Sequence, residues 1–396
     1  MIGSQHRGVG RSLASQERLR CQCARPLTSR FSGRAARLCV QAEAASPASQ
    51  TEASGQRKQR VVAIGEALFD LIADQKGVPR EKVSSWTPYA GGAPANVATA
   101  LAKLGLEVLF LGALGRDAPG DNLYQLIKSS GVRLDGLQRR DEPTRDVYVV
   151  RDDKGDREFA GFGRPTEQYC DAFLDAAALP LEEIRGSAVL VAGTLGLAYP
   201  GSRAAMRAAV KAAKEGGCKV LVDVNWRPVF WGDPQEALKE VMDFMQQADL
   251  IKVSDSDLDW LLSMEVPTAL VNPCGVADRF PAAAGVLVTA GGEGAAYCFK
   301  GPGGQLHTGF VPVFQVEVMD TTGAGDAFTS GFVYKLLEAG SIEALAADPV
   351  KLKEAVVFAA ASGALTCTRK GAITGQPKLQ EVQQLYESSK AWPNFW

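Results

Sequence analysis

Short apolar runs alternate with helical patterns along most of this chain. Continuous apolar runs predict buried strands of the parallel-sheet type at residues 61–64, 108–111, 189–191, 220–224, 250–253 and 286–289. A helical spacing of apolar residues occupies residues 94–105, 120–130, 203–216, 235–247, 255–264, 327–339 and 351–366. This alternation predicts an α/β fold, with helices on both faces of a doubly wound, mostly parallel sheet.

One segment interrupts the alternation. Residues 146–151 and 156–162 are typical of two β-strands, and the residues between them include Gly155, which suits a tight turn. The pattern therefore predicts a β-hairpin. A hairpin in an α/β chain often serves as a lid over a site or as an arm between subunits.

Charge is distributed unevenly along the 396 residues. Residues 1–42 contain eight Arg and a single acid, whereas the rest carries 35 Lys and Arg against 44 Asp and Glu, a net charge of −9. An Arg-rich, Ser-containing and acid-poor N-terminus has the composition of an organelle transit peptide. With a linker at 43–58, we expect residues 1–58 to be disordered and residues 59–396 to form one domain.

A basic arm that binds nucleic acid is the alternative for residues 1–42. The acidic remainder disfavours direct nucleic-acid binding, which depends on clustered positive charge. No uninterrupted apolar run is long enough to span a bilayer, so we expect no membrane partner.

Cysteine and histidine usage limits the chemistry. Beyond residue 42 the cysteines show no paired spacing, so we expect reduced thiols and no zinc site: Cys170, Cys218, Cys274, Cys298 and Cys367. Beyond residue 6 the only histidine is His307, which we expect at the surface in a glycine-rich turn. The sequence therefore excludes a multi-histidine metal site and a histidine-based catalytic triad.

The richest chemical pattern is the run 320–326, Asp-Thr-Thr-Gly-Ala-Gly-Asp, at the start of a predicted helix. The small residues Gly323, Ala324 and Gly325 let backbone N–H groups approach an anion at the positive end of that helix. Asp326 lies in the first turn, where it can take a proton from an attacking hydroxyl. The alternative is a glycine-rich helix start with an acid that suits the helix dipole.

A second glycine-rich turn precedes the helix predicted at 94–105. Gly91 and Gly92 allow a ligand to approach the backbone, and Asn96 can both donate and accept hydrogen bonds to hydroxyls. Asp70, after the first strand, could hold two sugar hydroxyls. A structural turn and a solvated loop acid are the alternatives. The P-loop motif and the three-glycine dinucleotide motif are both absent from the sequence.

Together these segments resemble the PfkB-type, ribokinase-like carbohydrate kinases. The family's two signatures match residues 91–98 and 320–326, and the resemblance extends over roughly residues 60–380. Residues 65–70, 85–89, 223–231 and 288–291 are most similar to fructokinases of the cyanobacterial type. The resemblance implies a ribokinase-like fold with a small β-lid formed by segments near 70–90 and 144–164.

The resemblance also implies roles for individual residues. Asp326 would be the catalytic base and Gly323, Ala324 and Gly325 the anion hole. The sugar would be held by Asp70, Gly91, Gly92, Asn96 and Arg164. ATP would be held by Asn225, Thr289, Gly291, Gly294 and Gly371.

Cations are implied as well. Mg²⁺ is tied to the segment 254–257, in which Asp257 retains the family's acid. An activating K⁺ would use Asp320 and Thr322 with the loop 369–371. Fructokinases commonly have Asn near position 360, where this chain has three consecutive alanines.

The resemblance thus implies an ATP-dependent fructokinase of the chloroplast stroma that forms fructose 6-phosphate, with a homodimer through the lid as a further expectation. Two alternatives stay open. One is a kinase of another sugar or nucleoside, such as ribose, 2-keto-3-deoxygluconate or adenosine. The other is a non-catalytic fructokinase-like component of the plastid transcription machinery. Residues 267–284 are expected to form a variable loop.

Overall fold

The computed structural model describes residues 59–153, 157–392 and 395. The predicted transit peptide and linker at 1–58, and Gly155 of the hairpin turn, lie outside the described residues. None of the described helices combines the length and apolar character needed to cross a lipid bilayer.

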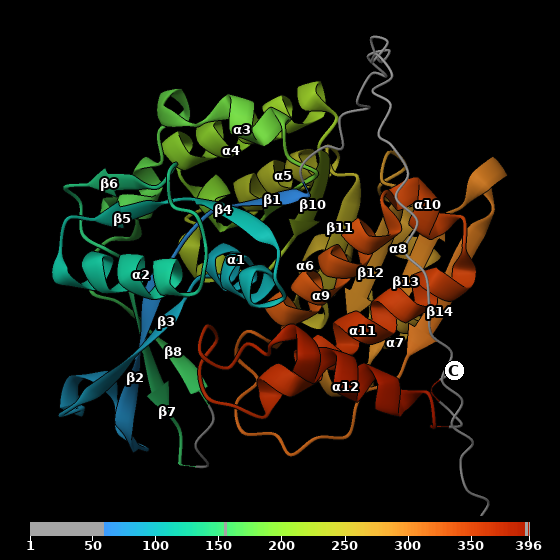
Figure 1. Ribbon diagram of the computed structural model, residues 1–396. Helices are drawn as coiled ribbons and strands as arrows, with labels where there is room; N and C mark the ends of the chain where they lie inside the picture. The colour runs from blue at the N-terminus through green and yellow to red at the C-terminus, as the bar shows by residue number, and fades with distance from the viewer. Residues whose placement is uncertain (1–58, 154–156, 393–394, 396) are drawn as a thin grey trace, which may run out of the picture. The chain divides into compact units, whose positions relative to one another are not determined.

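A central sheet organises the described part of the chain (Figure 1). Its strands are β1 (Arg60–Ile64), β4 (Glu107–Leu111), β9 (Val189–Ala192), β10 (Lys219–Asp223), β11 (Leu250–Ser254), β12 (Gly285–Thr289), β13 (Ala295–Lys300) and β14 (Leu306–Val311). They are ordered β14-β13-β12-β11-β10-β9-β1-β4. The strands from β12 to β4 run parallel, and β13 and β14 extend one edge antiparallel.

Helices cover both faces of this sheet. One face carries α1 (Ala93–Lys103), α2 (Ala118–Ser129), α9 (Ala324–Ala339), α10 (Ile342–Ala346), α11 (Pro349–Cys367) and α12 (Leu379–Ser389). The other carries α3 (Leu181–Arg185), α4 (Pro200–Gly216), α5 (Pro234–Met245), α6 (Asp255–Leu262), α7 (Val266–Val271) and α8 (Cys274–Ala277).

The core consists of two apolar layers because successive side chains of a strand point to opposite faces. In β1, Val61 and Ala63 pack in the layer under α1, α9 and α11, whereas Val62 and Ile64 pack in the layer under α4 and α5. Strands buried on both faces must be continuously apolar, which is why these runs were visible in the sequence.

A second, smaller sheet forms the lid, at the lower left of Figure 1. It consists of β2 (Leu68–Lys76), β3 (Trp86–Gly91), β7 (Asp146–Arg151) and β8 (Arg157–Phe162), in the order β3-β2-β7-β8. The short strands β5 (Ala113–Gly115) and β6 (Gln138–Arg140) pair separately. The hairpin predicted at 146–162 is therefore present as β7 and β8, and β2 and β3 complete the lid.

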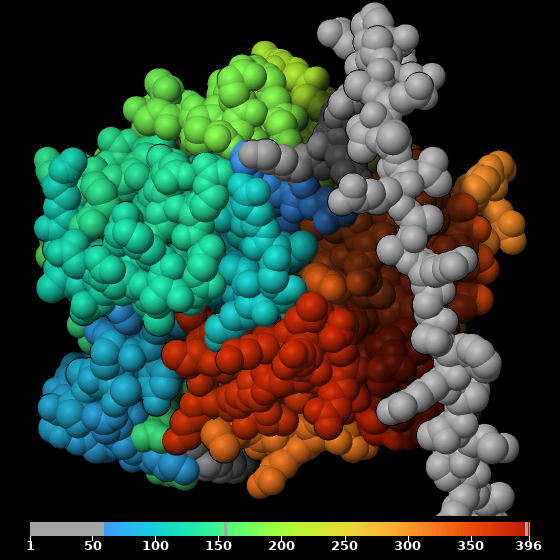
Figure 2. All heavy atoms as spheres, in the orientation of Figure 1, coloured from blue at the N-terminus to red at the C-terminus, as the bar shows by residue number. Residues whose placement is uncertain are grey.

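Segments distant in sequence meet beside the lid. Figure 2 shows the cyan surface of α1 against the red C-terminal segment. Lys103 at the end of α1 donates from Nζ to the carbonyls of Ile373, at 2.8 Å, and Gln376, at 3.1 Å. This contact joins α1, which follows the glycine-rich turn at 91–92, to the segment after α11.

The predicted strands are confirmed to within one residue at each end, and the predicted helices to within three. Several elements were missed. The segment 267–284, expected to be a loop, contains most of α7 and all of α8, which are too short to show a helical period. The β13–β14 hairpin and α12 were also not predicted, and His307 lies on β14 rather than in a turn.

The expectation that the five cysteines beyond residue 42 are all reduced thiols is wrong for two of them. Cys274 on α8 and Cys298 on β13 form a disulfide, with Cα atoms 5.3 Å apart. Their 24-residue separation matches no motif, and only the packing of α8 against β13 brings them together. Among the described residues, Cys170, Cys218 and Cys367 form no disulfide.

Candidate active site

A cavity of about 820 Å³ lies where the carboxyl ends of the parallel strands meet the lid. Its walls come from lid strands β2, β7 and β8, from the starts of α1 and α9, from the ends of β11 and β12, from the loop after β10, and from α11. The carboxyl edge of an open α/β sheet is the usual place for ligands, and this volume suits a substrate with its cosubstrate.

Most of the site residues assigned from the sequence line this cavity: Asp70, Gly91, Gly92, Asn96, Asn225, Thr289, Gly291, Gly294, Thr322, Gly323, Ala324, Gly325 and Asp326. Four assigned residues are not part of its lining: Arg164, Asp257, Asp320 and Gly371. The structure therefore brings together the residues of both glycine-rich turns, although they are more than 200 positions apart.

The glycine-rich run forms the start of α9, as predicted. Gly323 is the residue before the helix and has a φ of +81°, in the left-handed region that glycine adopts most easily. A Cβ atom there would lie 2.9 Å from the Cα of Ala372, so the space also requires glycine. The first turn of α9 thus presents its positive end to the cavity.

Asp326 lies in that first turn, and its Oδ2 accepts a hydrogen bond from Nδ2 of Asn96 at 2.8 Å. Burial raises the pKa of Asp326 to about 6, and the nearby Asp223 carboxylate adds to this effect. The hydrogen bond from Asn96 and the charges of Lys252 and Arg227 oppose the rise in pKa. Asp326 is therefore ionised at neutral pH and available as a base.

Glu66 is a buried site residue to which the sequence analysis gave no role. Its Oε1 accepts from the backbone N–H of Ala93 at 3.0 Å, at the start of α1, while its Oε2 has no hydrogen-bond partner among the described residues. Burial raises the pKa of Glu66 to about 7. The sequence contains one signal for a role of Glu66: it follows the first predicted strand, residues 61–64, by two positions.

Two further polar groups face the same end of the cavity. Oδ1 of Asn96 also has no hydrogen-bond partner in the described part of the chain. Burial raises the pKa of Asp70, on β2, to about 6, against the charges of Arg157 and Arg227. Leaving a buried polar atom without a hydrogen bond costs free energy, so Oδ1 of Asn96 and Oε2 of Glu66 are suited to the hydroxyls of a ligand.

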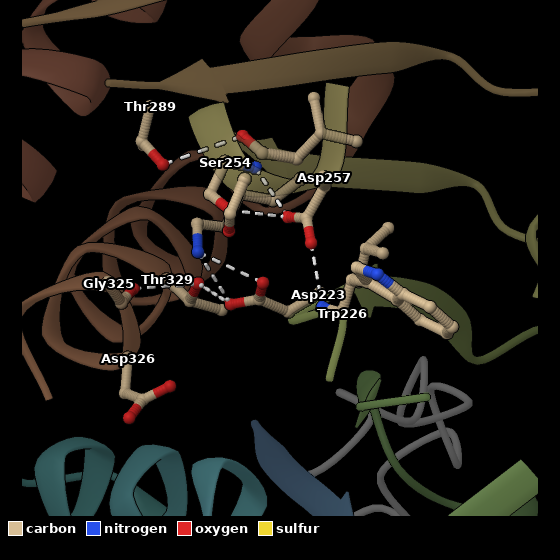
Figure 3. A network of polar contacts seen from close by, with 12 residues as sticks. Asp223, Trp226, Ser254, Asp257, Thr289, Gly325, Asp326 and Thr329 are labelled. Carbon is tan, nitrogen blue, oxygen red and sulfur yellow. Dashed lines mark hydrogen bonds and ion pairs between the residues drawn. The ribbon is translucent and has the colours of Figure 1, made fainter. Parts of the chain in front are cut away.

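Asp257 does not face the cavity, although it was assigned to magnesium. Its Oδ1 accepts from the backbone N–H of Trp226 at 2.7 Å, and its Oδ2 accepts from the N–H of Ser254 at 2.7 Å (Figure 3). Asp257 is the third residue of α6 and forms a capping box with Ser254. It thereby fixes the chain after β10 to the end of β11.

Arg164, which the resemblance assigns to the sugar, is exposed and lies outside the cavity lining. Arg157 on β8 reaches the anion-hole loop instead. Its Nη2 lies 3.0 Å from Oδ2 of Asp320, and Nη1 donates to Oγ1 of Thr322. The two arginines are seven positions apart: Arg157 begins β8 and pairs with Arg151 of β7, whereas Arg164 follows the end of β8.

The residues assigned to potassium lie together. The backbone N–H of Gly371 donates to Oδ2 of Asp320 at 3.0 Å, and the N–H of Thr322 donates to Oδ1 at 3.0 Å. Burial alone would raise the pKa of Asp320, but these hydrogen bonds and the charge of Arg157 lower it below its usual value. The cluster therefore holds an ionised carboxylate beside the anion hole.

The other end of the cavity is largely apolar. It is lined by Val313, Phe314 and Val316, and by Ala360 and Gly363 of α11. Such walls suit a flat heterocycle, and the alanine at 360 keeps this part of the wall apolar.

Two backbone positions near this end have left-handed conformations. Asn225, after β10, has a φ of +46°, which is unusual for a residue other than glycine and is a recurrent feature of functional sites. Gly294 has a φ of +106°, and a Cβ atom there would lie 2.6 Å from the carbonyl oxygen of Val311. Glycine is therefore required at this turn.

Comparison with known families gives a match over most of the chain. Residues 58–379 match the model of the pfkB family carbohydrate kinases. Fructokinase-2 of Solanum habrochaites is 34% identical over 326 residues, which cover 82% of this chain and 95% of the relative. Fructokinase-1 of Oryza sativa subsp. japonica is 34% identical over 336 residues, which cover 84% of this chain and 99% of the relative.

Solved structures show the same similarity. A fructokinase from Xylella fastidiosa with bound ATP has a TM-score of 0.74 at 29% identity, covering 84% of this chain and 99% of its own. A fructokinase from Vibrio cholerae O395 in its fructose, ADP and calcium ion bound form has a TM-score of 0.69 at 30% identity. That match covers 84% of this chain and 100% of its own.

Proposed function

Because the chain belongs to the pfkB family of carbohydrate kinases, we propose that it is an ATP-dependent fructokinase that forms fructose 6-phosphate. One observation carries the reaction type: Asp326 lies in the first turn of α9, directly after Gly323, Ala324 and Gly325, and both groups face the cavity. Fructose as the acceptor rests on the fructokinases among the relatives and neighbours.

The transfer needs one base and one anion site. The sugar hydroxyl oxygen forms a bond to the γ-phosphorus of ATP, and its proton passes to the Asp326 carboxylate. The bond from that phosphorus to the β,γ-bridging oxygen breaks, and its electron pair leaves with ADP. Negative charge spreads over the transferring oxygens, where the N–H groups at the start of α9 stabilise it.

The sugar would bind at the Glu66 end of the cavity. Asn96 Oδ1 and Glu66 Oε2 have no hydrogen-bond partner among the described residues and can bind sugar hydroxyls, while Asn96 Nδ2 stays on Asp326. Asp70 adds a carboxyl group from lid strand β2. The neighbouring lid strand β7 would bring the apolar side chains of Val147 and Val149 over the ligand, which would exclude water from the reacting groups.

Two arginines extend the positive region on the lid side. Arg157 is anchored on Asp320 and Thr322 at the anion-hole loop, and Arg227 lines the cavity after β10. Guanidinium groups pair well with phosphate oxygens. We therefore propose that Arg157, and not Arg164, is the arginine of the lid that acts at the reaction site.

The nucleotide would lie along α11 and the loop after β12. Thr289, Gly291 and Gly294 line the cavity at the end of β12 and after it, and Asn225 lines it after β10. The adenine would pack between the apolar side chains around Phe314 and the small residues of α11.

Magnesium is proposed to arrive with ATP, where it would neutralise phosphate charge. Among the described residues no group of three or more His, Cys, Asp or Glu side chains is arranged for a metal. Asp257 does not fit as a direct ligand, because both of its carboxylate oxygens are engaged. Asp255 lines the cavity and is the carboxylate of this segment that would meet a phosphate-bound cation.

Potassium activation stays a proposal for the Asp320 cluster. The Asp320 side chain is a poor candidate for a direct ligand, since Arg157, Thr322 and Gly371 already donate to its oxygens. Backbone carbonyls around the same loop are the remaining ligands. Exchange of KCl for choline chloride in the assay tests whether turnover depends on K⁺.

We also propose import into the chloroplast stroma, supported by the eight arginines and single acid of residues 1–42. Fusion of residues 1–58 to a fluorescent protein should give import and cleavage in isolated chloroplasts. The same fusion with the arginines replaced by glutamine is the control and should remain outside. A homodimer through the lid is a separate proposal, tested by sedimentation of the full chain.

The proposed activity is tested with the full chain, Mg·ATP and KCl against fructose, glucose, ribose, 2-keto-3-deoxygluconate and adenosine, with ADP release as the readout. Fructose should give the highest kcat/KM. A preference for another acceptor would keep the reaction and change the substrate. Absence of turnover with every acceptor, from folded protein, would favour the non-catalytic plastid role.

A further inference from the structure

A buried ion pair lies beneath the anion hole and has no role in the reaction described so far. Lys252 on β11 and Asp223 on β10 are 5% and 4% exposed, respectively. They are direct register partners of the parallel pair β10–β11. Nζ of Lys252 lies 2.9 Å from Oδ1 and 3.0 Å from Oδ2 of Asp223.

The same network reaches the first turn of α9. Oγ1 of Thr329 lies 2.8 Å from Oδ2 of Asp223 and 3.1 Å from the carbonyl oxygen of Gly325 (Figure 3). A Cβ atom added to Gly325 would lie 3.1 Å from Nζ of Lys252. The ammonium group is therefore adjacent to the backbone of the anion hole, and glycine at 325 is what allows this approach.

The ammonium group of Lys252 also has one N–H donor that no described residue accepts. An ammonium carries three N–H donors, and Asp223 is the only acceptor found for Nζ of Lys252 among the described residues. Lys252 is nevertheless part of the cavity lining. In the described part of the chain its third donor thus has no acceptor, at a place where phosphate oxygens would supply one.

A purely structural explanation fits this pair poorly. Removing two charges from water costs several kcal/mol per ion, and well-packed apolar residues often replace a buried pair without loss of stability. The neighbouring strand positions are indeed apolar: Val222 and Ile251 are fully buried. An ion pair at the one register position beside Gly325 therefore points to a function for the charge.

Resting on the proposed function, we infer that Lys252 is a fixed cation of the phosphoryl-transfer site, held behind the anion hole by Asp223. Its charge stabilises the negative charge that develops on the transferring phosphoryl oxygens, together with the N–H groups of α9. Lys252 exchanges no proton in the step: the hydroxyl proton goes to Asp326 and the electron pair of the broken bond leaves with ADP.

The charges around Lys252 are consistent with this assignment. Burial alone would lower the pKa of Lys252, but the Asp223 carboxylate, with contributions from Asp326 and Asp257, raises it above its usual value. Lys252 therefore remains a cation throughout the working pH range. In turn its charge opposes the rise in the pKa of Asp326, so that one group supports both the anion site and the base.

The test compares Lys252→Met, Asp223→Asn and the double variant in the full chain. Lys252→Met should lower kcat with fructose about 10²-fold, the loss expected for one preorganised electrostatic contact, with little change in the KM for fructose. The same variant removes the charge that opposes the rise in the pKa of Asp326 and leaves Asp223 unpaired. The acid limb of the pH profile of kcat/KM, where Asp326 ionises, should therefore also move to higher pH. Lys219→Met, on β10 with an exposed partner at Glu343, is the matched control and should keep normal turnover.

The double variant separates catalysis from folding. It removes both charges, so it should fold with near-normal stability, and its acid limb should return toward that of the wild type. Its kcat on the pH plateau should nevertheless stay within about threefold of Lys252→Met. Recovery of wild-type kcat in the double variant would show that the pair serves only the fold and would overturn the inference.

A binding measurement distinguishes this inference from the proposed function. Calorimetry with ADP and with the non-hydrolysable analogue AMP-PCP should show that the double variant loses affinity for AMP-PCP about 10-fold more than for ADP, as expected for one charged contact to the γ-phosphate. This readout needs no turnover and no particular sugar. Equal losses for both nucleotides, in a protein that binds them, would contradict the placement of Lys252 at the γ-phosphate.

Discussion

The two ends of the reaction cavity differ in how far their polar groups are already satisfied. At the phosphoryl end, Lys252 is paired with Asp223, and Asp257 holds three hydrogen bonds from the chain. At the sugar end, Glu66 and Asn96 each leave one buried oxygen without a partner in the described residues. Charge is preorganised where the phosphoryl group passes, whereas the sugar end is completed only by its ligand.

The elements at each end explain this difference. The phosphoryl end is built on β10, β11 and the start of α9, which are fixed by strand register and by packing against the core. The sugar end lies between the start of α1 and the lid strands, which form a separate sheet. Rigid elements hold charges precisely enough to stabilise a transition state, while a lid can close on a neutral sugar.

The largest expected effect comes from removing the base that lies between the two ends. Asp326→Asn should lower kcat about 10³-fold, within the range for loss of a general base, and leave fructose affinity nearly unchanged. The amide keeps an oxygen that can accept from Asn96. Kinetics and calorimetry with fructose measure the two effects, and near-normal turnover would rule out Asp326 as the base.

The lid side is tested by two arginines in one segment. Arg157→Ala should lower kcat about 10-fold, since it removes a charged contact to the anion-hole loop, whereas Arg164→Ala should change kcat less than about twofold. Both arginines are exposed and outside the cavity lining, but of the two only Arg157 contacts Asp320 and Thr322 among the described residues, which makes Arg164 the matched control. The reverse order of effects would restore the assignment made from the sequence.

The sugar end should respond mainly in KM. Glu66→Ala removes the acceptor for the N–H of Ala93 and one partner for the sugar, so the KM for fructose should rise about 10-fold with a smaller change in kcat. Glu66→Gln keeps an acceptor for Ala93 and should stay within about threefold of the wild type. A larger effect of Glu66→Gln than of Glu66→Ala would contradict this role.

The smallest effect is on stability and depends on pH. The folded pKa of Asp326, about 6, lies above that of an unfolded Asp, so the folded state binds more protons between pH 4 and 6. Stability therefore falls as pH rises through this range, and the cost is fully present above pH 6.

Asn does not titrate, so Asp326→Asn should raise the free energy of unfolding by about 3 kcal/mol at pH 8 and by almost nothing at pH 4. Urea unfolding at both pH values measures the difference. Asp259→Asn, at an exposed acid on α6, should change stability by less than about 0.5 kcal/mol at either pH. An equal gain at pH 4 and pH 8 would mean that ionisation of Asp326 is not the cause.

The sequence alone determined the features that depend on local chemistry. The alternation of apolar runs and helical periods predicted the doubly wound sheet, because buried parallel strands and amphipathic helices each need their own period. The glycines before Asp326 predicted an anion site at a helix start, because only small residues allow a ligand to approach the backbone there.

Tertiary structure decided the features that depend on which segments meet. The pairing of Lys252 with Asp223 follows from the register of two strands, and the contact of Arg157 with Asp320 follows from the packing of the lid strand β8 beside the loop before α9. The capping role of Asp257 depends in part on a backbone N–H contributed by another loop. These contacts join residues that are distant in sequence, and no periodic pattern encodes them, because a side chain's partner is set only when the sheet, the helices and the lid have packed.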